Sequence, residues 1–273
     1  MFTRQSLRGA LSAVTAGPLV EGGGGRSAVS TTPSRTFVLV HGAWHGGWCW
    51  RRVQNILTAN GCRVFTPSLT GVGDRAHLFS KDISLQTHVD DVISLVEAEE
   101  LNDFVLVGHS YAGLVITGVA DVLRERVSHY IYLDATVPED MSPGASFGWS
   151  DSNAAELREA RLKLVREHGN SVALPPPLPD AFAVTEPSDV AWVRRRLRSM
   201  PLQTYLGKIM LKSQGSTGLG RTYIAAIKPL YVPLAATHDR IKADKSWSYA
   251  TIETGHDMMV TAPSELASLL IQA

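Results

Sequence analysis

The stretch from Phe104 to Gly113 places a serine between a strand and a helix. It begins with an apolar, β-branched run typical of a buried strand and continues into Gly108-His109-Ser110-Tyr111-Ala112. The apolar run from Leu114 to Ala120 that follows is typical of a buried helix. This order predicts a crowded, strained turn that pushes the Ser110 hydroxyl clear of the sheet, with N–H groups of the helix start beside it. The alternative is a glycine-rich turn without chemistry, because Ala112 replaces the last glycine of Gly-x-Ser-x-Gly.

The composition restricts what such a serine can do. A chain of 273 residues with 44% hydrophobic content can form one large α/β domain without metals or disulfides. The net charge is zero, which gives no general attraction for nucleic acid or an anionic membrane. The two cysteines, Cys49 and Cys62, do not have zinc-site spacing, and we expect both to be structural and reduced. We therefore expect neither a metal nor a cofactor.

Residues 1–35 differ from the rest of the chain. Two arginines precede a mildly apolar stretch over residues 10–20, and a glycine run follows at residues 22–25. An export signal and a flexible extension both fit this pattern, so cytoplasmic and exported locations both stay open. No stretch of about 20 apolar residues suitable for a membrane span occurs in the sequence.

From residue 36 onward strands and helices alternate. Apolar runs predict strands at residues 37–40, 63–67, 103–108, 129–133, 221–227 and 247–254. Amphipathic or apolar helical patterns separate most of them. Alternation of this kind predicts an α/β fold with a mostly parallel six-stranded sheet, helices on both faces and the site at the carboxyl edge.

The alternation stops between residues 137 and 220. This segment starts with a Pro/Gly/Ser-rich stretch, has helical patterns at 154–168 and 188–199, and contains no strong strand pattern. We expect a helical cap over the active edge at 137–220, with the core formed by 36–136 and 221–273. The arginines at 194–196 fit a solvated helix face better than a nucleic-acid surface.

A histidine follows the last predicted strand. His256 comes directly after Gly255, which places it at the same sheet edge as Ser110. A single histidine is usually a packed or surface residue. In a chain that already has a serine turn, His256 is a candidate general base.

Two motifs make the chain resemble the α/β-hydrolase superfamily from about Thr36 to the C-terminus. His-Gly-Ala-Trp-His-Gly-Gly-Trp-Cys-Trp at 41–50 and Gly-His-Asp-Met-Met-Val-Thr at 255–261 are similar to the small plant-type esterases and hydroxynitrile lyases and their bacterial relatives. The resemblance implies that Ser110 is the nucleophile and His256 the base. It also implies an oxyanion hole formed by the N–H groups of Ala43 and Tyr111.

The third member of the triad departs from the common family pattern. The acid usually follows the penultimate strand, but residues 227–233 contain no carboxylate. Asp134 ends the strand after the nucleophile's helix, a position that some superfamily members use, and we assign the acid there. Asp239 and a histidine without an acid are the alternatives, and Asp134 could instead cap the segment that follows it.

The resemblance favours hydrolysis of a carboxylic ester. Related lyases have Thr and Lys where this chain has Gly42 and Asp257, and the carboxylate would oppose release of cyanide. A hydroxynitrile lyase and a non-catalytic ligand-binding protein of the same fold remain the alternatives. Dehalogenation is excluded because the turn has a serine instead of an aspartate.

Aromatic and apolar residues predict an uncharged, hydrophobic small-molecule ester as the substrate. The predicted substrate contacts are Trp44, His45, Trp149 and Met258. For each of them, ordinary packing is an equally good explanation. A homo-oligomer stays open, because nothing in the sequence decides the oligomeric state.

Overall fold

The computed structural model describes residues 35–273, so the prediction for residues 1–35 lies outside the described residues apart from Arg35. Six strands form one sheet in the order β10-β9-β4-β3-β1-β2. Their bounds are β1 Thr36–Val40, β2 Arg63–Phe65, β3 Phe104–His109, β4 Val127–Leu133, β9 Arg221–Ala226 and β10 Ser248–Ile252. Every neighbouring pair is parallel. The predicted six-stranded sheet is therefore confirmed.

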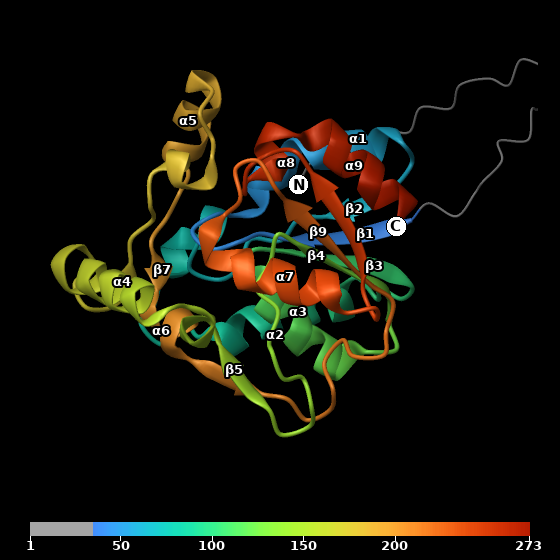
Figure 1. Cartoon of the computed structure of the whole chain (residues 1–273), viewed down its shortest axis with the longest axis horizontal. Helices are drawn as coiled ribbons and strands as arrows, with labels where there is room; N and C mark the ends of the chain where they lie inside the picture. The colour runs from blue at the N-terminus through green and yellow to red at the C-terminus, as the bar shows by residue number, and fades with distance from the viewer. Residues whose placement is uncertain (1–34) are drawn as a thin grey trace, which may run out of the picture. The chain divides into compact units, whose positions relative to one another are not determined.

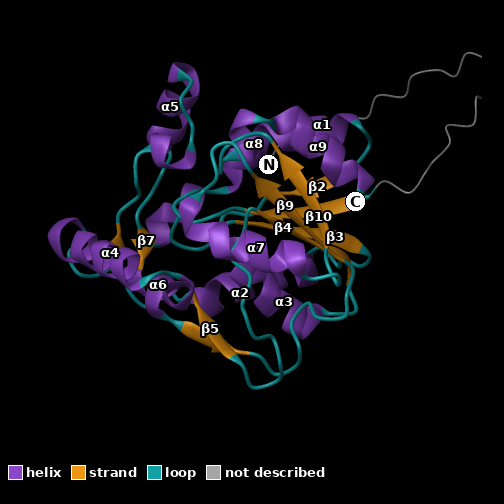
Figure 2. Ribbon diagram, in the orientation of Figure 1, coloured by secondary structure: helices purple, strands orange, loops and turns teal. Residues whose placement is uncertain are grey.

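Helices cover both faces of this sheet (Figures 1 and 2). In the view of Figure 1, α1 and α9 lie above the strands, and α2 and α3 lie below them. The helices of the core are α1 Arg51–Ala59, α2 Leu85–Ala98, α3 Ala112–Leu123, α7 Ala235–Ala243, α8 Met258–Thr261 and α9 Pro263–Gln272. The strands β3 and β9 are buried along their whole length, because they lie inside the sheet with helices on both sides.

The segment between β4 and β9 lies beside the sheet, on the left in Figure 1. It contains α4 Ala155–His168, α5 Pro187–Arg194, α6 Leu202–Leu206 and four short strands, β5 Ser146–Gly148, β6 Ala173–Leu174, β7 Met200–Pro201 and β8 Lys208–Met210. The strands form two antiparallel pairs, β5 with β8 and β6 with β7. The sequence shows no strong strand pattern here, because strands of two or three residues are too short to show an alternating pattern.

Short 3-10 helices connect several elements, at Gly47–Trp50, Gly73–Leu78, Trp149–Ser152, Pro179–Phe182 and Val232–Leu234. The helix α2 starts at Leu85, because the side chain of Ser84 caps it and exchanges hydrogen bonds with Thr87. Within residues 35–273, no helix is long and apolar enough to cross a bilayer.

Candidate active site

The backbone at Ser110 has the strained conformation that the sequence predicted. Its φ angle is +55°, in the left-handed region that residues with side chains seldom adopt. The chain is crowded on both sides of this turn. A Cβ atom at Gly108 would lie 2.7 Å from the carbonyl oxygen of Ala112, and one at Gly113 would lie 2.1 Å from that of Thr136. The two glycines therefore allow the turn that exposes the serine.

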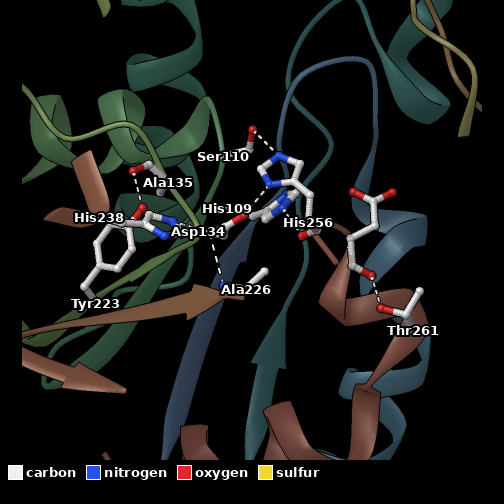
Figure 3. Close-up of polar contacts among 10 residues, drawn as sticks. His109, Ser110, Asp134, Ala135, Tyr223, Ala226, His238, His256 and Thr261 are labelled. Atoms are coloured by element: carbon white, nitrogen blue, oxygen red, sulfur yellow. Dashed lines mark hydrogen bonds and ion pairs between the residues drawn. The ribbon is translucent and has the colours of Figure 1, made fainter. Parts of the chain in front are cut away.

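Three distant segments meet at Ser110. The Oγ atom of Ser110 lies 2.9 Å from Nε2 of His256, and Nδ1 of His256 lies 2.6 Å from Oδ2 of Asp134. Figure 3 shows this chain of contacts, with the imidazole between the hydroxyl and the carboxylate. A carboxylate accepts only, so Nδ1 of His256 carries a proton and donates it, and Nε2 is free to accept from Ser110. The structure brings together the three predicted residues, whereas Asp239 is exposed on α7.

Asp134 is fully buried and held by more than one donor. Its Oδ1 accepts hydrogen bonds from Nε2 of His238 at 2.6 Å and from the backbone N–H of Ala226 at 3.2 Å. Burial alone would raise the pKa of Asp134, but the hydrogen bonds from His238 and His256 outweigh it and lower this pKa to about 2. The carboxylate is therefore ionised at neutral pH.

His256 is supported from its ring face and its backbone. The ring of Tyr231 stacks on the imidazole with 4.0 Å between centroids and an angle of 18° between planes. Nε2 of His109, in the serine turn itself, lies 3.0 Å from the carbonyl oxygen of His256 and donates to it. Burial lowers the pKa of His109 to about 3. The neutral imidazole of His109 therefore holds the backbone of His256 in place.

The oxyanion hole of Ala43 and Tyr111 stays a prediction. Within residues 35–273, neither of the two N–H groups donates to another backbone group in a loop, turn or cap. The first loop approaches the serine turn closely at Gly42. A Cβ atom at Gly42 would lie 2.8 Å from Nδ1 of His109 and 2.9 Å from Cβ of Ser110.

His45, a predicted substrate contact, lies against Asp257. Nε2 of His45 is 3.0 Å from Oδ2 of Asp257, and its Nδ1 is 2.8 Å from the carbonyl oxygen of Ala43. Burial alone would lower the pKa of His45, but the charge and hydrogen bond of Asp257 raise it. The same pairing lowers the pKa of Asp257 against the effect of burial. The carboxylate of Asp257, whose charge the argument against a lyase used, is therefore buried and paired with His45.

The other predicted substrate contacts are also buried. Trp44 and Trp149 pack edge to face at 5.4 Å, and Trp149 lies 5.1 Å from the ring of Tyr111. The guanidinium of Arg161 covers Trp149 at 4.6 Å, and Met258 is fully buried at the start of α8. Substrate contact by these side chains stays a prediction.

A cavity of about 330 Å³ lies between the core and the segment that follows β4. Its core side includes Leu114 and Thr136, and its outer side includes Phe147. The N–H of Thr136 donates to the carbonyl oxygen of Ser110 at 3.0 Å, which connects the cavity wall to the serine turn, but neither Ser110 nor His256 lines the cavity. Its charged lining residues are Glu139, Asp140, Asp151 and Arg240. None of the four predicted substrate contacts lines it.

Sequence reasoning missed His238 and Tyr231, which touch Asp134 and His256. Both lie after β9, where the family pattern led us to look for a carboxylate, and neither residue type is a carboxylate. Within residues 35–273, no group of three or more His, Cys, Asp or Glu side chains has the arrangement of a metal site.

Comparisons with known proteins show the family of the chain. A model of the Alpha/beta hydrolase family matches residues 37–269. A carbendazim hydrolyzing esterase from Nocardioides sp. (strain SG-4G) is 39% identical over 244 residues, which cover 86% of this chain and 97% of that protein. A pheophorbidase from Raphanus sativus is 26% identical over 249 residues, covering 87% and 93% of the two chains.

A solved structure has the same fold. An extracellular alpha/beta-hydrolase from a Paenibacillus species matches with a TM-score of 0.76 and 22% identity over 88% of this chain and 98% of that one. At this identity the likeness concerns the fold alone.

Proposed function

Because the chain belongs to the Alpha/beta hydrolase family, we propose that it is a serine esterase in which Ser110, His256 and Asp134 are the catalytic residues. The observation that carries the proposal is the unbroken hydrogen-bond chain from the hydroxyl through the imidazole to the carboxylate. Nucleophile, base and acid are all side chains, so the chemistry requires neither metal nor cofactor.

The reaction proceeds through an acyl-enzyme. His256 takes the proton of Ser110 as the hydroxyl oxygen attacks the ester carbonyl, and Asp134 stabilises the imidazolium that forms. The N–H groups of Ala43 and Tyr111 bind the tetrahedral oxyanion, and each is worth roughly 100- to 1,000-fold in rate. The alcohol leaves with the proton from His256. Water then repeats the same steps and releases the acid.

The substrate is an uncharged small-molecule ester. The cavity beside the serine turn has an apolar part that includes Leu114, Val137 and Phe147, and its volume of about 330 Å³ suits a small organic molecule. Three carboxylates and one arginine among its lining residues disfavour an anionic substrate. We assign residues 137–220 to a cap, and the lining residues 146–148 on the outer side of the cavity belong to it.

The test is hydrolysis of p-nitrophenyl esters by the wild type and Ser110→Ala. We expect turnover by the wild type, with a burst of one nitrophenolate per protein where deacylation is slow, and a loss of about 10⁶-fold in kcat in the variant. A fluorophosphonate should label the wild type once and leave Ser110→Ala unlabelled. Tight ligand binding without any turnover or labelling would instead favour a non-catalytic binding protein. That alternative has lost its main support, since it relied on a missing acid and Asp134 contacts His256.

A further inference from the structure

Asp134 contacts two imidazoles, and the triad uses only one of them. His256 lies on Oδ2 and His238 lies on Oδ1, each at 2.6 Å. Figure 3 shows the carboxylate between the two rings, with Ala226 below it. Nε2 of His238 must carry a proton to donate to a carboxylate, so His238 and His256 present opposite ring nitrogens to the same acid.

His238 comes shortly after residues 227–233, the loop in which the family pattern led us to look for the acid. It lies on α7, the helix that follows this loop, whereas Asp134 directly follows β4, 104 positions earlier. This segment supplies a donor instead of a carboxylate, and the donor meets the acid from the other strand. His238 is 5% exposed, and the ring of Tyr223 packs edge-on against it at 5.4 Å.

The second hydrogen bond fixes how the carboxylate is turned. Without His238, Oδ1 would keep one donor, the N–H of Ala226 at the longer distance of 3.2 Å. A carboxylate that can rotate about its Cβ–Cγ bond no longer holds the imidazole in one orientation. In an active site, a small error in the orientation of a catalytic group lowers the rate more than it weakens substrate binding.

We propose that His238 is a positioning residue that locks the Asp134 carboxylate, so that Oδ2 always faces His256. The inference rests on the proposed esterase function and extends the triad by one residue. His238 touches neither the substrate nor the nucleophile, and it acts only through Asp134.

The test compares His238→Leu, which fills the space without a donor, with His238→Gln, whose amide N–H reaches a similar position. Turnover is measured per active site counted by fluorophosphonate labelling, so that misfolded protein does not count. Because a hydrogen bond to a charged group is lost, kcat of the leucine variant should fall roughly 10- to 100-fold, with KM changed less than about threefold. The glutamine variant should recover most of that loss. Asp239→Asn, the exposed neighbour on the same helix, is the matched control and should behave as the wild type.

A double-mutant cycle separates positioning from packing. In an Asp134→Asn background, His238→Leu should cost less than threefold, because the residue through which it acts has already been altered. Each of three results would overturn the proposal. His238→Leu could lower kcat equally in both backgrounds, or the leucine and glutamine variants could lose the same rate. The kcat of the leucine variant could also lie within twofold of that of the wild type. If the leucine variant does not fold, His238→Asn, whose amide is too short to reach Asp134, takes its place.

These outcomes differ from a failure of the esterase proposal itself. A wild type that neither turns over esters nor reacts with the fluorophosphonate would overturn the proposed function. A wild type that does both, together with an unaffected His238→Leu, would overturn the role of His238 and leave the function intact.

Discussion

Besides the His238–Asp134 contact, two buried histidine–aspartate pairs, His256–Asp134 and His45–Asp257, lie near each other and can be compared. In both pairs a ring nitrogen meets a carboxylate oxygen, at 2.6 Å between His256 and Asp134 and at 3.0 Å between His45 and Asp257. The other nitrogen of His256 meets the hydroxyl of Ser110, whereas that of His45 meets the carbonyl oxygen of Ala43. A histidine–aspartate pair is therefore a base only where its second nitrogen is free to accept a proton from a nucleophile.

The second pair has a mechanical role. Its histidine belongs to the loop after β1 and its aspartate to the segment after β10, so the pair links these two parts of the chain. The loop after β1 carries the proposed oxyanion donor Ala43, and the segment after β10 carries His256. We infer from this arrangement that the His256–Asp134 pair serves the proposed chemistry and that the His45–Asp257 pair holds the two loops in place.

The largest expected effect is the loss of activity when the carboxylate of Asp134 is removed. Asp134→Asn should lower kcat by roughly 10⁴-fold, because the amide favours the wrong tautomer of His256 and does not stabilise imidazolium. Stopped-flow or steady-state assays with a p-nitrophenyl ester measure this loss. Near-normal turnover in Asp134→Asn, together with an inactive Asp239→Asn, would move the acid to α7.

The second pair should affect stability more than chemistry. Asp257→Ala leaves a buried imidazole without its partner and should reduce the free energy of unfolding by about 3 to 5 kcal/mol. Urea denaturation measures the change, and kcat per labelled active site should fall far less than in Asp134→Asn. A fully stable variant with a loss of rate as large as that of Asp134→Asn would erase the distinction between the pairs.

The stability that this pair provides should depend on pH. The pKa of His45 is raised above its usual 6.5 in the folded state, so its contribution is fully present below pH 6.5 and is lost as the pH rises through the raised value. The lowered pKa of Asp257 means that its contribution is lost only in acid, below the usual 3.8. The difference in unfolding free energy between the wild type and Asp257→Asn should therefore shrink as the pH rises above 6.5. A difference that grows with pH would show that His45 is not charged in the fold.

The smallest effect concerns the ring that stacks on His256. Tyr231→Leu removes an aromatic face from the imidazolium formed during the reaction, and we expect a loss of about fivefold in kcat. Tyr231→Phe keeps the ring and is the matched control, expected within twofold of the wild type. If the two variants lose the same rate, the hydroxyl of Tyr231 matters and the stacking does not.

Local patterns predicted most of the fold and the centre of the site. The strand before Ser110 and the helix after it are visible in adjacent residues, and the parallel order brings the ends of β3, β4 and β10 to one edge. Asp134 was assigned because it ends the neighbouring strand and because some members of the superfamily carry the acid at that position. These features depend on short stretches of chain or on topology, and both leave clear marks in a sequence.

Contacts between side chains that are far apart in the sequence could not be predicted from local patterns. His45 and Asp257 are 212 positions apart, and His238 and Asp134 are 104 apart, so no periodicity connects them. An aromatic-rich loop made His45 a plausible substrate contact, although its ring nitrogens are both used by the protein. Contacts of this kind could not be predicted, because the partner of a polar group, and not its own position in the sequence, decides its role.

The close approach at Gly42 restricts how this scaffold can be converted to another activity. The related lyases have a threonine at this position, yet any side chain here would collide with Ser110 and with the ring of His109. Introducing that threonine therefore requires the first loop to move away from the nucleophile before new chemistry can begin. A laboratory route from this esterase to cyanohydrin cleavage would have to begin with loop replacement, since single-site exchange at Gly42 would damage the starting activity first.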